Sequence, residues 1–378
     1  MTGLLSVRQW SFVHRWSSLV CTLFLLMLCL TGLPLIFHDE IEAWTEPDPF
    51  VQGDTQAVQG DAQVRGSPDM DGLVQLVRDR YPDRRVQFVV WLEDEGTYRF
   101  GLTRSPRHPP DEKPFVLVDG RNATIVGEAW SEKDWRHGGF MECILRLHTD
   151  MFAGLAGSLI LAGMGALLVV SLISGLVLYG PFMSKLRFGT VRRNRARSTK
   201  WLDLHNLLGV VTVAWVCVVG VTGIINTLDT FVFRAWQSGI EARLHLDRDR
   251  ALVETPASLQ RVVDAARGTA PGMAVSFVAF PGSMFAGRHH YAVYLRGDSP
   301  LTSRLLRPVL VDAASAAAED AGEPPWYLWL LEGARPLHFG DYGGLPLKIL
   351  WALFDLVSIV VLASGVYLWL RRYVARGG

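Results

Sequence analysis

The chain has 378 residues, of which 49% are hydrophobic, and its 37 basic and 37 acidic residues give a formal net charge of zero. This balance excludes a general electrostatic attraction to nucleic acid, so no nucleic-acid partner is expected. The hydrophobic fraction resembles that of soluble proteins, but the apolar residues are concentrated in four long runs.

Each of the four runs is long enough to cross a bilayer as a helix. Residues 17–37, 151–184 and 205–228 contain no charged side chain, and residues 349–370 contain only Asp355. About 20 apolar residues suffice for a membrane-spanning helix. The first run is longer than the core of a signal peptide, which predicts an anchor that is not cleaved. We therefore predict a protein of the lipid bilayer with four transmembrane α-helices, at 1–37, 149–182, 201–228 and 345–372.

The basic residues predict how the chain is oriented. The link at 183–200 contains no acidic residue and seven basic ones, namely Lys185, Arg187, Arg192, Arg193, Arg195, Arg197 and Lys200. Further arginines precede the first run and follow the fourth, which leads into the tail at 373–378. By the positive-inside rule these segments and both termini face the cytoplasm, and residues 38–148 and 229–344 lie on the other side.

The two long outer segments follow one pattern of elements. Each contains a short amphipathic helix followed by strands with alternating apolar residues, which predicts a small α+β domain in each segment. The first segment has its helix at 73–80 and strands at 86–91, 97–102 and 115–118; the second has its helix at 259–266 and strands at 275–280, 290–295 and 308–311.

The helical runs also repeat. A spacing of 18 positions from a histidine to the glycine of a Thr-Gly pair, and one of 27 positions from a histidine to the glycine of a Ser-Gly pair, occur once in each half. The first spacing joins His14 to Gly32 and His205 to Gly223, and the second joins His148 to Gly175 and His338 to Gly365. Since each half leaves the cytoplasm and returns to it, we predict two parallel internal repeats.

The repeat sorts four histidines into two pairs. Equivalent residues of parallel repeats lie at equal depth, so His14 is expected to face His205 near the cytoplasmic side, and His148 to face His338 near the outer side. Two facing imidazoles supply both axial ligands of a haem iron, and bis-histidine ligation leaves no open position, which favours electron transfer. Because no C-x-x-C-H motif is present, we predict two non-covalent b haems.

Other residues near these histidines are weaker candidates. Arg15, Arg146 and Arg335 lie within three residues of a paired histidine and are predicted to meet haem propionates. His38 is the alternative outer ligand, but Asp229 stands at its repeat position. Imidazole also suits zinc, copper or nickel, which stay open as alternative metals.

Two further groups of polar residues receive no firm role. Asp355 fits either a polar contact within the bundle or a proton relay, and Gly165 at its repeat position favours neither. The remaining histidines lie in the outer segments and are not expected to bind a ligand; they are His108, His137, His245, His289 and His290.

The motifs around the paired histidines resemble a known family. They are His14-Arg15-Trp16, Leu147-His148, D-L-H-N-L-L-G at 203–209, P-L-H-F-G at 336–340, Ser364-Gly365, and V-L-V-D-G at 116–120. Together they resemble the PepSY-associated transmembrane family over nearly the whole chain, with PepSY-like domains at 38–148 and 229–344. Within that family the likeness is greatest to the inner-membrane siderophore reductases of the ferrioxamine type.

The resemblance implies a two-haem reductase of the bacterial inner membrane, with His14, His148, His205 and His338 as the haem ligands. Such a protein reduces a ferric hydroxamate siderophore in the periplasm and releases Fe(II). Its electron donor would be quinol or a separate reductase, because the chain has no dinucleotide-binding G-x-G-x-x-G context. Two other functions stay open: transport of siderophore or haem between the repeats, and a non-redox sensory or inhibitory role.

Overall fold

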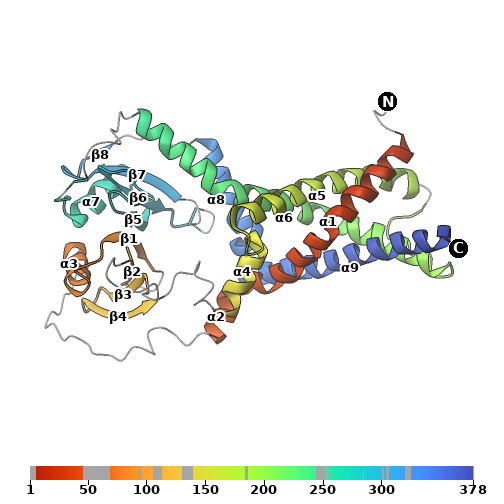
Figure 1. Cartoon of the computed structure of the whole chain (residues 1–378), viewed down its shortest axis with the longest axis horizontal. Coiled ribbons are helices and arrows are strands. Elements are labelled where there is room, and N and C mark those ends of the chain that lie inside the picture. Colours follow the sequence, from red (N-terminus) through yellow and green to blue (C-terminus); the bar gives the residue numbers. More distant parts are fainter. Residues whose placement is uncertain are drawn as a thin grey trace. The chain divides into compact units, whose positions relative to one another are not determined.

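The computed structural model divides the chain into two compact units (Figure 1). The helical unit comprises Met1–Ile41, Phe140–Thr230 and Ala334–Gly378, and the sheet unit comprises Glu42–Gly139 and Phe231–Gly333. Within them the structure describes residues 6–45, 69–92, 96–104, 113–129, 139–183, 186–243, 252–253, 255–283, 285–299, 302–303, 306–319 and 325–377.

Four helices are long and apolar enough to cross a membrane, as the sequence predicts. They are α1 (Val7–Ile36), α5 (Gly154–Met183), α6 (Arg197–Arg243) and α9 (Gly344–Gly377). The third continues well past the predicted end at residue 228, because residues 229–238 contain neither proline nor glycine to stop it.

Shorter helices flank these spans. They are α2 (His38–Thr45), α4 (Phe140–Asp150), α8 (Trp326–Phe339) and the 3-10 helix η1 (Asp341–Gly343). Left-handed residues turn the chain between α4 and α5, where Met151, Phe152 and Gly154 have φ of 52°, 57° and 57°. Gly340 and Gly344 do the same between α8 and α9, with φ of 79° and 57°. His148 and His338 therefore lie on short helices that precede the spans.

Helices of the helical unit pack closely through small residues. α1 contacts both α5 and α9, and a Cβ added to Gly165 of α5 would lie 2.9 Å from Ile224 Cγ1 of α6. Such close approach is typical of helix packing in membranes. Near the start of α9 the buried Lys348 ammonium lies 3.0–3.1 Å from carboxylate oxygens of Asp39 and Glu40, which compensates its charge.

One antiparallel sheet of eight strands forms the sheet unit, in the order β4-β3-β2-β1-β5-β6-β7-β8. The strands are β1 (Val86–Trp91), β2 (Thr97–Leu102), β3 (Phe115–Asp119), β4 (Thr124–Ala129), β5 (Ala274–Ala279), β6 (His290–Arg296), β7 (Leu306–Asp312) and β8 (Ala318–Glu319). The prediction of a separate small sheet in each outer segment is thus modified, since β1 and β5 pair with Val89 opposite Val278. Joining them removes two apolar edges that would otherwise be open to mispairing.

Two amphipathic helices pack on this sheet, α3 (Met70–Arg80) and α7 (Leu259–Thr269). Their apolar residues join those of the strands in one buried core that includes Val77, Phe100 and Val262. The Asp71 carboxylate of α3 accepts hydrogen bonds from the Ser258 hydroxyl and the Leu259 N–H at the start of α7. That carboxylate ties the two helices together and caps the second of them.

Candidate functional site

The four predicted ligand histidines meet in two pairs within the helical unit. The ring centroids of His14 on α1 and His205 on α6 lie 6.4 Å apart, with their planes at 68°. Those of His148 on α4 and His338 on α8 lie 6.2 Å apart, with their planes at 67°. The structure therefore brings together the same partners that the repeated spacing pairs.

This separation suits two imidazoles bound in line to one metal ion. A metal–imidazole nitrogen bond is about 2.0–2.1 Å and a ring nitrogen lies about 1.15 Å from the ring centre, so two in-line ligands have centroids roughly 6.3–6.5 Å apart. The observed separations of 6.4 and 6.2 Å agree closely. Two rings can also lie at this separation without a metal ion. Binding to a metal further requires that each ring keep one nitrogen without a proton, so the hydrogen bonds of the ring nitrogens have to be considered.

In the first pair, hydrogen bonds identify the free nitrogen. His14 Nδ1 lies 2.9 Å from the Ser171 carbonyl oxygen, and His205 Nδ1 lies 3.0 Å from that of Val361. A carbonyl only accepts, so each Nδ1 carries the proton and donates it. Each Nε2 then keeps its lone pair, which is the tautomer that a metal ligand needs.

The second pair has the same tautomer. His338 Nδ1 lies 3.0 Å from the Val219 carbonyl oxygen, and His148 Nδ1 lies 2.8 Å from Thr31 Oγ1. The Thr31 hydroxyl donates its proton to the Met27 carbonyl at 2.8 Å, so it accepts from His148. Burial lowers the pKa of His148 to about 3, with a further contribution from His338, and burial lowers the pKa of His338 as well. Both imidazoles are therefore neutral at physiological pH.

Each of the four imidazoles also lies against a glycine of a neighbouring helix. The glycines belong to the Thr-Gly and Ser-Gly pairs of the repeated spacings. A Cβ added to the glycine would lie 3.0 Å from the ring for Gly175 and His14, 3.3 Å for Gly32 and His148, 3.1 Å for Gly223 and His338, and 3.4 Å for Gly365 and His205. A Cβ at Gly175, Gly223 or Gly32 would require the ring to shift by a few tenths of an ångström, whereas one at Gly365 would just reach van der Waals contact. Larger side chains would displace the rings, so the repeated spacings mark the positions against which the imidazoles pack.

The two pairs occupy different levels of the helical unit. On α1, His14 belongs to one pair and Gly32 touches the other, 18 positions further on. At 1.5 Å per residue this corresponds to about 27 Å along the helix. The same interval separates His205 from Gly223 on α6. The two levels are therefore closer together than the ends of a full span, which is roughly 35 Å long.

The three arginines predicted to meet propionates differ in their surroundings. Arg335 is 67% exposed and Nη2 pairs with Asp229 at 3.0 Å. Arg146 Nη2 pairs with Asp150, also at 3.0 Å. Arg15 lies over the ring of Trp16 at 5.6 Å and, unlike the other two, forms no ion pair with a carboxylate of the described residues. Its buried Nε, like that of Arg146, has no hydrogen-bond partner among the described residues. Arg15 is thus the best placed of the three to bind an anionic group.

The alternative candidates have local partners. His38 Nδ1 lies 3.0 Å from the Leu35 carbonyl oxygen, and its Nε2 lies 2.9 Å from Asp39 Oδ1, so neither nitrogen is left for a metal. Asp355 is buried and contacts the thiol of Cys29. His108, His137 and His245 lie outside the described residues, whereas His290 has acidic neighbours that the sequence did not predict.

Sequence reasoning also missed the carbonyl groups that orient the rings, because a backbone group leaves no mark in residue identity. A signal exists nevertheless. Each carbonyl lies three positions before the Ser or Thr of its pair, and that hydroxyl bonds the same oxygen. The contacts run from Ser174 to Ser171, Ser364 to Val361, Thr222 to Val219 and Thr31 to Leu28.

These features define a multi-span membrane protein with two matched imidazole pairs. The chain belongs to the PepSY-associated transmembrane family, because the model of the PepSY-associated TM region matches residues 11–372. An uncharacterized protein of Pseudomonas aeruginosa is 24% identical over 252 residues, which cover 61% of this chain and 64% of that protein. The match thus spans less than two thirds of the length of this curated relative.

Proposed function

We propose that the chain is a di-haem reductase of the bacterial inner membrane that passes electrons across the bilayer to a ferric hydroxamate siderophore in the periplasm, releasing Fe(II). One observation carries the proposal: two histidine pairs at separations of 6.4 and 6.2 Å, each ring donating from Nδ1. The likeness to the ferrioxamine reductases supplies the substrate class.

The residues present fit haem b as the resident group. Histidine is a common axial ligand of haem iron, and two of them complete its coordination. Among the described residues, the one group of three or more potential metal ligands within 4.8 Å of one another is His290, Asp312 and Glu319. Neither histidine pair therefore has a nearby carboxylate or thiolate of the kind that zinc or copper sites add to imidazole. When bound, haem would supply one-electron redox chemistry between Fe(III) and Fe(II).

The chain's own residues hold the two levels and fill the space between them. Trp215 on α6 lies ten positions after His205 and seven before Thr222. The centroid of its ring lies 6.5 Å from that of Trp351 of α9, edge to face, and 5.9 Å from that of Phe354, with the rings stacked. We infer that this aromatic cluster shortens the electron path between levels that lie about 27 Å apart.

The matched contacts of the two halves also support two parallel repeats. The basic residues near the ends of the spans favour both termini in the cytoplasm and the sheet unit in the periplasm. A transport function draws less support. Each of the four spans is one continuous helix, whereas substrate sites of transporters are typically built from broken helices near mid-membrane.

The proposal is tested on the purified protein in detergent. A reduced-minus-oxidised spectrum should show b-type bands, with two haems per chain by pyridine haemochrome. Adding a ferric hydroxamate to the anaerobically reduced protein should reoxidise it, while the Ga(III) complex of the same chelator, which accepts no electron, should not. A colourless protein would contradict haem binding, and equal reoxidation by both complexes would contradict ferric reduction.

The hydroxyl of Thr31 gives a second test of the site. Thr31→Val removes the group 2.8 Å from His148 Nδ1, and loss of such an orienting partner typically weakens metal binding by 10–100-fold. The Leu28 carbonyl remains as an acceptor, so we expect about tenfold faster transfer of one haem to excess apomyoglobin. Thr22→Val is the matched control, because that hydroxyl bonds the Ser18 carbonyl of its own helix. Equal rates for both variants would show that Thr31 does not position His148.

A further inference from the structure

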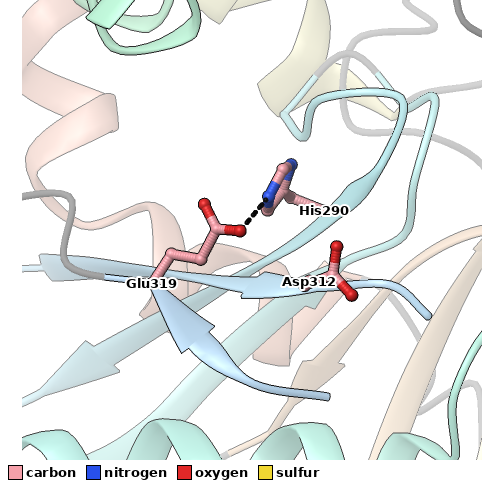
Figure 2. Close-up of side chains that lie close together, drawn as sticks. All are labelled: His290, Asp312 and Glu319. Carbon is pink, nitrogen blue, oxygen red and sulfur yellow. Dashed lines mark ion pairs between the residues drawn. The ribbon is translucent and has the colours of Figure 1, made fainter. Parts of the chain in front are cut away.

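A second cluster of potential metal ligands lies in the sheet unit. His290 is the first residue of β6 and faces Asp312, the last of β7, across the sheet register. Glu319 ends the neighbouring strand β8. One ligand atom from each of the three residues lies within 4.8 Å of the others (Figure 2).

The imidazole of His290 is buried without satisfied hydrogen bonds. The residue is only 2% exposed, and neither ring nitrogen has a hydrogen-bond partner among the described residues. Nε2 lies 3.0 Å from Glu319 Oε1, an ion-pair distance, but without hydrogen-bond alignment. Buried polar groups in folded proteins are normally satisfied, so this exception requires an explanation.

The equivalent strands in the first half of the chain show which of these residues the sheet needs for its own structure. Thr97 opens β2 and faces Asp119 at the end of β3, in the register that His290 and Asp312 repeat. Asp119 Oδ1 accepts the Arg121 N–H in the following turn. An aspartate is therefore needed for the turn, but threonine serves at the strand position. Neither the imidazole nor Glu319 is explained by the sheet.

Asp312 keeps one oxygen for another partner. Its Oδ1 accepts the N–H groups of Ala314 and Ser315 and the Ser315 hydroxyl, at 3.1, 2.7 and 2.7 Å. Among the described residues no hydrogen bond is made to Oδ2, and Glu319 is one-third exposed, which leaves a route to solvent.

We propose that His290, Asp312 and Glu319 bind a divalent first-row transition-metal ion of the Zn²⁺ or Fe²⁺ type. Imidazole nitrogen and carboxylate oxygen both coordinate zinc, and zinc sites with three protein ligands keep a fourth position for water. The imidazole favours such ions over Mg²⁺ and Ca²⁺, which prefer oxygen alone. The two carboxylates neutralise the dication. The inference rests on the sheet unit and does not depend on the haem proposal.

Zinc binding to the full-length protein in detergent tests the site. Exposed thiols such as Cys143 are first blocked with N-ethylmaleimide, because free cysteines also bind zinc. After chelation and dialysis, Zn²⁺ is titrated calorimetrically into the unaltered protein and two variants. Glu319→Gln removes one charged ligand at constant shape, and His290→Thr installs the residue that the first half carries at this position. Glu128→Gln is the control, an edge-strand carboxylate bonded to the Tyr81 hydroxyl at 2.5 Å.

We expect one zinc ion per chain, with affinity at least about tenfold weaker in both cluster variants and unchanged in the control. Haem content should be the same in all four proteins. Zinc binding and haem binding are thus measured independently, and failure of one proposal can be told from failure of the other. Absence of zinc binding, or equal affinity in the unaltered protein and both variants, would overturn the inference.

Discussion

Replacing His148 by alanine is expected to halve the b-type haem absorbance of the purified protein, and adding His14→Ala is expected to remove the rest. Each change deletes one of two neighbouring imidazoles that we propose as the ligands of one haem, and the partner ring alone cannot complete bis-histidine coordination. The two pairs occupy separate levels, about 27 Å apart along α1, so the losses should be additive. Haem per chain is measured by pyridine haemochrome.

His38→Ala provides the control for this experiment. His38 lies at the end of the first span, but both of its nitrogens have local partners, the Leu35 carbonyl and Asp39. Its removal should therefore leave haem content unchanged. If His38→Ala lost haem while His148→Ala retained it, the outer ligand would have to be reassigned to the alternative that the sequence left open.

A valine at Gly175 is expected to eliminate the haem of the His14 and His205 pair as completely as loss of a ligand. Even a single Cβ at this position lies 3.0 Å from His14 Cε1, and valine adds two methyl groups. The His14 ring donates a hydrogen bond to the Ser171 carbonyl, which lies on the same helix as Gly175. It therefore cannot move away from the valine side chain without breaking that bond and losing its orientation. We expect one haem per chain and retention of the signal from the other pair.

Gly163→Val in the same helix is the matched control. Among the described residues, a Cβ built at Gly163 meets no side chain and no backbone of another helix within 4 Å. Valine is also as apolar as the rest of the span, so two haems should remain. Equal haem content in the two variants would show that the imidazole does not need the glycine seat.

Much of the helical unit can be predicted because its information lies in residue spacing. The four spans follow from apolar length, and the pairing of His14 with His205 follows from the recurrence of an 18-residue interval to Gly32 and Gly223. A second interval of 27 residues adds His148 and His338 in the same way. These histidines could be paired from the sequence because a parallel repeat fixes relative depth even when no contact is known.

The remaining features depend on contacts that spacing does not encode. The pairing of β1 with β5 joins segments almost two hundred residues apart, and nothing in either strand names its partner. The short helix α4 is separated from α5 by a left-handed turn at Met151 and Phe152, whose side chains give no warning of positive φ. The sequence predicts no ligand for His290, because Asp312 and Glu319 approach it only through sheet register.

The hydrogen bonds that orient the imidazoles lie within each half of the chain, whereas the pairing of the rings joins the two halves. His14 is seated by α5 and His148 by α1, both in the first half, whereas His205 is seated by α9 and His338 by α6 in the second. Each imidazole pair nevertheless takes one ring from either half. If the proposed function is right, a half-length polypeptide would orient its own imidazoles yet complete a haem site only as a homodimer, an arrangement that duplication and fusion of one gene would convert into a single chain.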